Sequence, residues 1–157
     1  MAGIAPTFNL PNMSKKKVAI ISASWHKEIC ESLVAGAQRA LTQANVTIDP
    51  VIHVPGSFEL PLAAQFALDG GADAAVVLGV VVRGETPHFD YVCQGVTDGV
   101  MQVSLSRSKP IGFGVLTVEN VAQAIARSGV AGSTEDKGFD ATVAALELLR
   151  IKDSVIG

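Results

Sequence analysis

The chain has 157 residues, of which 48% are apolar and 17% are charged. This length fits one domain with its own hydrophobic core, and the composition excludes a disordered chain, a coiled coil and a disulfide scaffold. The formal net charge of −3 lacks the basic excess of a general nucleic-acid-binding protein, so we expect no nucleic-acid partner.

The sequence contains no segment that resembles a membrane span. The longest apolar run, Ala74 to Val82, is far shorter than the roughly 18 residues that a transmembrane helix needs. The first residues do not combine a charged start with an apolar stretch, as a secretory signal would. We therefore expect a cytoplasmic protein without a membrane partner, in which Cys30 and Cys93 are reduced.

Residues 1–16 are predicted to form an N-terminal tail, because prolines and polar residues interrupt any regular pattern there. Apolar side chains such as Phe8 and Leu10 indicate that the tail lies against another surface. Residues 17–157 are predicted to form a single α/β domain without internal linkers or repeats.

Short apolar runs and helical periodicity alternate along this domain. Ser24 is a candidate N-cap for the first helix, and Asn45 suits the end of that helix. The predicted elements are a strand at 18–21, a helix to about 44, a strand at 47–54, a helix at about 60–70, a strand at 74–82, a helix with its apolar face at 92–103, a strand at 111–116, a helix from 121 to near 129, and a final helix that contains 139–146.

Repeated strand–helix–strand units require parallel strands with right-handed crossovers. The expected fold is therefore a three-layer α/β/α sandwich of the flavodoxin-like kind, with a four-stranded parallel sheet. Ligands of such sheets bind beyond the carboxyl ends of the strands. In this sequence the loops expected there hold residues 22–26, 55–59, 83–88 and 117–119.

The loop from Arg83 to His88 is the richest in candidate chemistry. Gly84 allows a ligand to approach the backbone closely, and the free N–H groups of the following helix favour an anion. His88 can act as an acid or a base near neutral pH. A helix that simply begins with a histidine and a nearby threonine is the alternative interpretation.

Other loop residues also allow two interpretations. Trp25, the only tryptophan, could stack on a flat ligand or cover the core. Glu59 could accept hydrogen bonds from a ligand or complement the dipole of its helix. Lys137 could be a solvated charge. His53, within a predicted strand, is expected to be structural.

Several common motifs are absent from the sequence. It contains no dinucleotide-binding or phosphate-binding glycine loop, no nucleophile elbow and no zinc-protease motif. Cys30 and Cys93 have no partner at the spacing of metal ligands. We therefore expect neither a cofactor nor a metal site.

Five segments together resemble the lumazine synthase family, and the similarity runs from about Lys17 to Leu149. The segment that ends in the His88 loop is the most specific of the five. The segments are Ser24–His26, Val54–Pro61, Leu78–Val92, Gly114–Thr117 and Glu135–Gly138.

The resemblance implies a transferase of riboflavin biosynthesis that needs no cofactor. In the penultimate step of that pathway, 5-amino-6-(D-ribitylamino)uracil condenses with 3,4-dihydroxy-2-butanone 4-phosphate to form 6,7-dimethyl-8-ribityllumazine. Imine formation, loss of phosphate and ring closure each require proton transfers, for which a histidine is suited.

The resemblance also implies roles for individual residues. His88 corresponds to the proton-transfer histidine of the family. Residues implied to bind the pyrimidine and the ribityl chain are Trp25, Ser57, Phe58, Glu59, Val80, Val81, Val82, Phe113 and Lys137. Residues implied to bind the butanone phosphate are Gly84, Glu85, Thr86 and Arg127.

The assembly expected from the resemblance is a homopentamer. The segment between Arg127 and Lys137 looks longer than in members that build icosahedral shells, which goes with free pentamers. The predicted fourth helix would also carry Arg127 about 12 Å from the carboxyl edge of the sheet, away from its own His88. Active sites shared between neighbouring subunits are therefore expected.

Two other functions remain as alternatives. A non-catalytic protein that binds lumazine or flavin on the same fold could keep Trp25 and Glu59, but it would not need a phosphate site. A flavodoxin-like signalling or electron-transfer domain would need a phosphate loop or an acidic pocket after the first strand, and Ser22–Trp25 provides neither.

Overall fold

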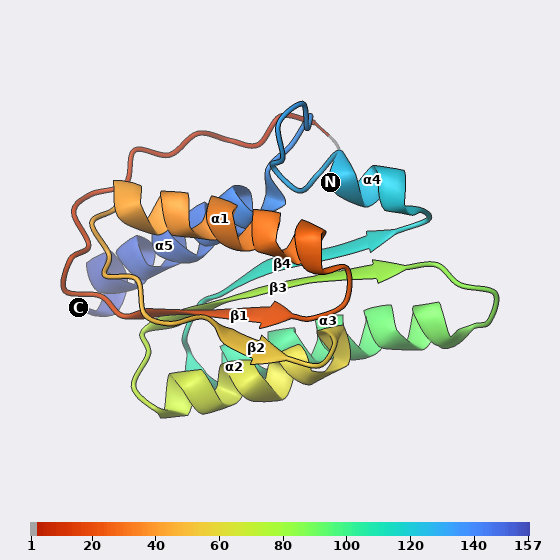
Figure 1. Cartoon of the computed structure of the whole chain (residues 1–157). Helices are drawn as coiled ribbons and strands as arrows, with labels where there is room; N and C mark the ends of the chain where they lie inside the picture. Colours follow the sequence, from red (N-terminus) through yellow and green to blue (C-terminus); the bar gives the residue numbers. More distant parts are fainter. Residues whose placement is uncertain (1–2) are drawn as a thin grey trace.

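A computed structural model describes residues 3–157 and contains a four-stranded, all-parallel sheet in the order β2-β1-β3-β4. The strands are β1 (Val18–Ala23), β2 (Ile52–Val54), β3 (Ala74–Val82) and β4 (Ile111–Val118). Their carboxyl ends all lie on one side of the molecule, as Figure 1 shows. The predicted parallel sheet is confirmed.

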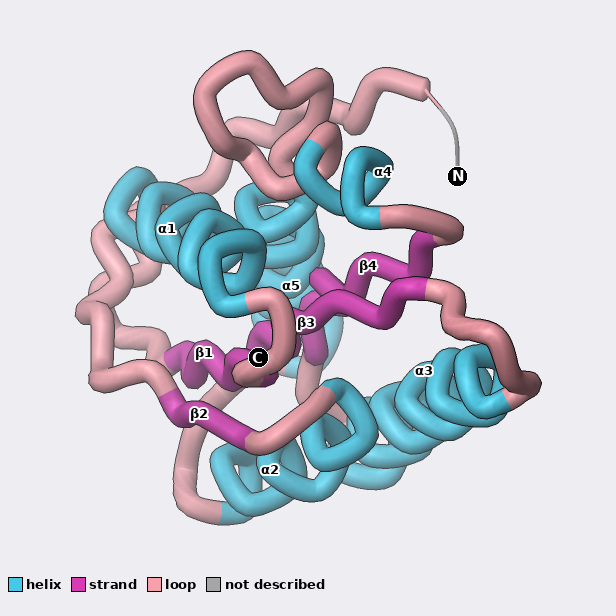
Figure 2. The backbone as a smooth tube through the Cα atoms, turned by 45° about the vertical axis from the view of Figure 1, so that its right-hand side comes forward, coloured by secondary structure: helices cyan, strands magenta, loops and turns pink. Residues whose placement is uncertain are grey.

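Helices cover both faces of this sheet. They are α1 (Lys27–Gln43), η1 (Ser57–Glu59), α2 (Leu60–Asp69), α3 (His88–Arg107), α4 (Val121–Ile125) and α5 (Lys137–Ile156). Helices α1 and α5 pack on one face and α2 and α3 on the other, while α4 lies on the α1 side (Figures 1 and 2). The three-layer α/β/α fold is therefore confirmed.

The central strand β3 is apolar throughout because helices cover both of its faces. Val76 and Leu78 belong to the core under α1 and α5, while Val77 belongs to the core under α2 and α3. The crossing of α1 and α5 is close. A Cβ atom on Gly138 would lie 2.0 Å from the carbonyl oxygen of Leu33, so only glycine fits there.

Two predictions at the ends of α1 and β2 are wrong. The N-cap of α1 is His26, with φ of 53°, and not Ser24, whose hydroxyl instead donates to the carbonyl of Val54 at 2.8 Å. The second strand begins only at Ile52, since β2 pairs with β1 over three residues. Asn45 has φ of 59° after the end of α1, as its residue type indicates.

The fourth helix is also shorter than predicted, since it ends at Ile125. The carbonyl oxygens of Ile125 and Ala126 accept from nearby hydroxyl and N–H groups instead of continuing the helix. Arg127 therefore lies in a turn after the helix. The prediction that the fourth helix itself carries Arg127 away from His88 is therefore wrong.

The described part of the tail, residues 3–16, contacts α5 at several points. Met13 is 5% exposed and Leu10 packs against the same core, while Lys16 Nζ contacts Asp153 Oδ1 at 2.8 Å. Residues 3–10 and the side chains of α5 line a groove of about 800 Å³. Across residues 3–157, no helix has the length and apolar character needed to cross a membrane.

Candidate active site

Strand β3 extends beyond β1 at the carboxyl edge of the sheet. Pairing between β1 and β3 reaches Ser22 opposite Leu78, whereas pairing between β3 and β4 continues to Val82 opposite Val118. In the described chain, the β1-side backbone edge of residues 80–82 therefore has no neighbouring strand. Its N–H and C=O groups can pair with the amide edge of a planar ring.

The loop after β1 holds Trp25 at this edge with its side chain 71% exposed. The carbonyl of Trp25 accepts a hydrogen bond from the Cys30 thiol at 3.1 Å. Burial raises the pKa of Cys30 to about 11, so the thiol stays protonated at neutral pH and can donate. The exposure shows that Trp25 does not cover the core, and its ring is free to stack on a ligand.

The loop after β2 meets Trp25. A Cβ atom on Gly56 would lie 3.5 Å from the indole ring, and Glu59 Oε2 accepts from the Gly56 N–H at 2.9 Å. The hydroxyl of Ser57 is buried and has no hydrogen-bond partner in the described structure. It faces Gly79 of β3, where a Cβ atom would lie only 2.5 Å from it. These contacts bring the loops after β1 and β2 against β3.

The loop after β3 is exposed from Gly84 to Pro87, and His88 is the first residue of α3. Its side chain is exposed as well. The Asp90 N–H donates to the carbonyl of Pro87 at 3.0 Å, and the N–H groups of His88 and Phe89, which have no partner within a helix, can receive an anion here. His88 is thus an exposed imidazole at the amino end of a helix that begins at the carboxyl edge of the sheet.

Arg83 links this loop through its side chain to α3 and to the residue that follows β4. The sequence did not predict these contacts. Arg83 Nε contacts Glu119 Oε2 at 2.6 Å, Nη1 lies 3.4 Å from Asp90 Oδ1, and the guanidinium stacks 4.3 Å from the centre of the Phe89 ring. The hydrogen bond to Glu119 raises the pKa of Arg83 further, so the guanidinium stays charged. The one feature of the sequence that could have pointed to Arg83 is its position directly before Gly84.

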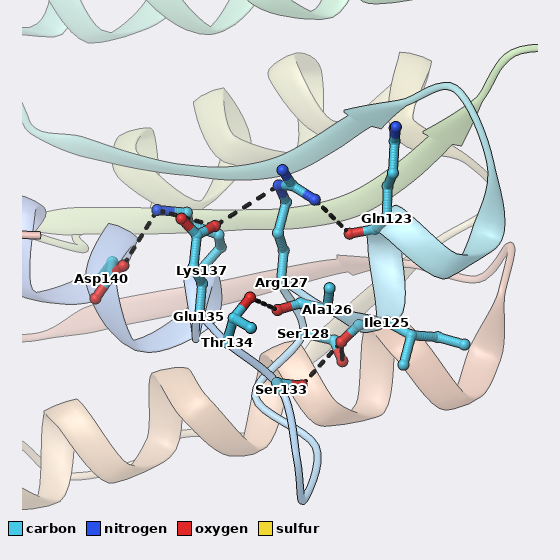
Figure 3. Close-up of polar contacts among 10 residues, drawn as sticks. All are labelled: Gln123, Ile125, Ala126, Arg127, Ser128, Ser133, Thr134, Glu135, Lys137 and Asp140. Atoms are coloured by element: carbon cyan, nitrogen blue, oxygen red, sulfur yellow. Dashed lines mark hydrogen bonds and ion pairs between the residues drawn. The ribbon is translucent and has the colours of Figure 1, made fainter. Parts of the chain in front are cut away.

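Arg127 and Lys137, here named the cation pair, form a second group on the other side of β4. The backbone N–H of Lys137 donates to the carbonyl of Arg127 at 2.9 Å, and both side chains approach Glu135 (Figure 3). Phe113 lies on β4, the edge strand, and is 40% exposed. The sequence did not predict the contacts of Glu135 either, because they depend on the backbone bridge between Ser128 and Asp136.

The predicted site residues therefore fall into two groups within one chain. Trp25, residues 57–59, residues 80–82 and the loop 84–88 gather at the carboxyl ends of β1, β2 and β3. Arg127 follows α4 and Lys137 begins α5, and both helices pack on the face of the sheet opposite α3 (Figure 2). In the described chain, no hydrogen bond or ion pair joins the loop 84–88 to the cation pair.

The sequence of residues 15–153 matches a family model described as 6,7-dimethyl-8-ribityllumazine synthase. The chain belongs to this family. Relatives named 6,7-dimethyl-8-ribityllumazine synthase agree with the match. That of Kineococcus radiotolerans is 55% identical over 131 residues, which are 83% of this chain and 81% of the relative.

Two further relatives of the 6,7-dimethyl-8-ribityllumazine synthase family cover similar shares. The Nocardioides protein is 52% identical over 133 residues, or 85% of this chain and 83% of its own length. The Streptomyces coelicolor protein is 49% identical over 142 residues, or 90% and 88%. The family match spans both groups of candidate residues, the open edge of β3 and the cation pair.

Proposed function

We propose that this chain catalyses the condensation of 5-amino-6-(D-ribitylamino)uracil with 3,4-dihydroxy-2-butanone 4-phosphate to 6,7-dimethyl-8-ribityllumazine. The observation that carries the proposal is the exposed indole of Trp25 beside the unpaired edge of β3 in a member of this family. The direct test mixes the protein with both substrates and follows the absorbance of the lumazine product. Ligand binding without product formation would instead support a non-catalytic binding protein.

The group at the carboxyl ends of β1 to β3 is proposed to bind the pyrimidine. Trp25 stacks on the ring, and the backbone of residues 80–82 pairs with the uracil amide. Glu59 accepts hydrogen bonds from the ribityl hydroxyls, and Ser57 and Phe58 form the wall of that turn. The 71% exposure of Trp25 and the free backbone edge support these assignments.

The second substrate is proposed to lie beside His88. The N–H groups of Gly84, Glu85 and Thr86 would surround its phosphate, with the Glu85 side chain turned away, and Arg127 would approach from the opposite side. His88 would then transfer the protons of imine formation and phosphate elimination. The exposed loop and the adjacent helix N-terminus support this arrangement.

The catalytic unit is proposed to be residues 17–157, with residues 1–16 as a tail, in a cytoplasmic homopentamer. Each site would combine Trp25 and His88 of one subunit with Phe113, Arg127 and Lys137 of its neighbour. A cyclic, head-to-tail contact repeats such pairing at every interface. The separation of the two groups within one chain supports this assembly.

Binding of a lumazine or a riboflavin analogue should quench the fluorescence of Trp25, because the ligand ring would stack on the indole. Since the chain has a single tryptophan, the emission reports this residue alone. Replacing Trp25 with alanine should weaken binding by roughly 1–3 kcal/mol, the scale of base–aromatic stacking. Undiminished emission at saturating ligand would contradict the stacking role.

Arg127→Ala should raise the Michaelis constant for the butanone phosphate selectively. We expect a loss of about 1.5–3 kcal/mol, the scale of a hydrogen bond to a charged group. In the unsubstituted protein, inorganic phosphate should compete with this substrate and not with the pyrimidine. Steady-state kinetics with each substrate varied in turn would measure both effects, and equal losses for the two substrates would contradict the assignment.

A further inference from the structure

A carboxylate lies between the two members of the cation pair. Glu135 Oε2 is 3.6 Å from Arg127 Nε and 3.6 Å from Lys137 Nζ, as the dashed lines of Figure 3 mark. Both distances exceed the roughly 2.7–3.2 Å that is typical of N–H···O hydrogen bonds. One oxygen is therefore shared loosely between two cations and is bound tightly to neither.

The backbone of this loop sets the arrangement. Ser128 and Asp136 form an antiparallel bridge, which places Arg127 opposite Lys137. Glu135 directly precedes the bridging residue Asp136 and Lys137 directly follows it, at the start of α5. The register of the loop thus brings Glu135 close to both Arg127 and Lys137.

The cation pair remains open to a larger anion. Arg127 Nη1 donates to the carbonyl of Gln123 at 2.9 Å, yet the Arg127 side chain is 43% exposed. The Glu135 side chain is 26% exposed, and Lys137 has a second acidic neighbour, Asp140, at 3.4 Å. Ion pairs this close to solvent are weak and easily exchanged. A phosphate, with more charge and more oxygens, matches the guanidinium fork better than one shared carboxylate oxygen.

We propose that Glu135 is a built-in competitor for phosphate at the cation pair. It neutralises Arg127 and Lys137 when the site is empty, and a phosphate must displace it or bind beside its like charge. Glu135 thereby lowers the affinity for inorganic phosphate and favours its release as a product. This inference rests on the proposed role of Arg127 in phosphate binding.

The test is a calorimetric titration of the full chain, in its native assembly, with inorganic phosphate. Glu135→Gln keeps the size of the side chain and removes its charge, so the dissociation constant should fall roughly twofold to fivefold, the effect expected of a partly exposed ion pair. Asp49→Asn is the matched control. Asp49 carries the same charge and pairs with Lys17 next to the amino end of β1, so its removal should leave the affinity unchanged.

A double substitution separates a local effect from a general change in charge. In an Arg127→Gln background, most of the gain from Glu135→Gln should disappear, because the two residues act on one anion. Glu135→Ala provides a second neutral variant should the glutamine variant fold poorly. Unchanged phosphate affinity in both neutral variants, or a gain that persists without Arg127, would overturn the proposal.

These results are independent of turnover. Phosphate binding is measured without either organic substrate, so a protein that formed no lumazine would contradict the proposed function and leave the titration interpretable. Unaltered phosphate affinity in a protein that does form lumazine would instead contradict only the role given to Glu135.

Discussion

Replacing His88 with alanine is expected to lower the turnover number by on the order of 10²-fold or more, the usual contribution of an acid–base group. The reason is the position of His88 at the start of α3, beside the exposed loop that is proposed to hold the phosphate. Some activity should remain, because holding the two reactants together supplies much of the acceleration. Initial rates of lumazine formation at saturating substrates would measure the loss.

His53→Ala provides the matched control for this experiment. His53 lies in the edge strand β2 with its side chain exposed, so its prediction as a structural residue is not supported by burial. Its removal should change neither turnover nor stability appreciably. Quenching of Trp25 by ligand should be intact in both variants. Wild-type turnover in a folded His88→Ala protein would contradict the proton-transfer role.

Subunit mixing should restore activity to two variants that are each nearly inactive. His88→Ala and Arg127→Ala proteins would be unfolded together and reassembled. If each site uses His88 of one chain and Arg127 of the next, roughly a quarter of the interfaces in a random mixture contain both intact residues. The total rate of lumazine formation should therefore recover to about a quarter of that of the same amount of wild-type protein.

The control for mixing is each variant unfolded and reassembled alone, beside wild-type protein treated in the same way. If His88 and Arg127 served the same chain, every site in the mixture would keep one lesion. Activity would then stay at the level of the single variants, and the shared site would be refuted. The result tests the sharing directly, whichever number of subunits the assembly contains.

Much of the fold could be predicted from the sequence because its signals are local. The apolar run of β3 was predicted with its observed bounds, Ala74–Val82, since a strand covered on both faces needs apolar residues at every position. The alternation of strands and helices required a parallel sheet. Asn45 marked the end of α1 because few other residue types adopt a left-handed conformation.

The errors lie where a distant partner decides the local structure. Ser24 has a good capping side chain, but the carbonyl of Val54 takes its hydroxyl, and this contact exists only when β2 lies beside β1. The fourth helix stops at Ile125 because hydroxyls from residues 133 and 134 fold back onto its last carbonyl groups. No local pattern reveals such competition.

The same distinction applies to the candidate site. The sequence by itself determined which loops meet at the candidate site, because parallel strands bring their carboxyl ends to one edge. Only the tertiary structure placed Arg83 against Glu119 and put Glu135 between the members of the cation pair. These contacts join residues from separate segments or across a folded loop. Their distances follow from strand register and loop pairing, which depend on the packing of the whole chain and not on local residue patterns.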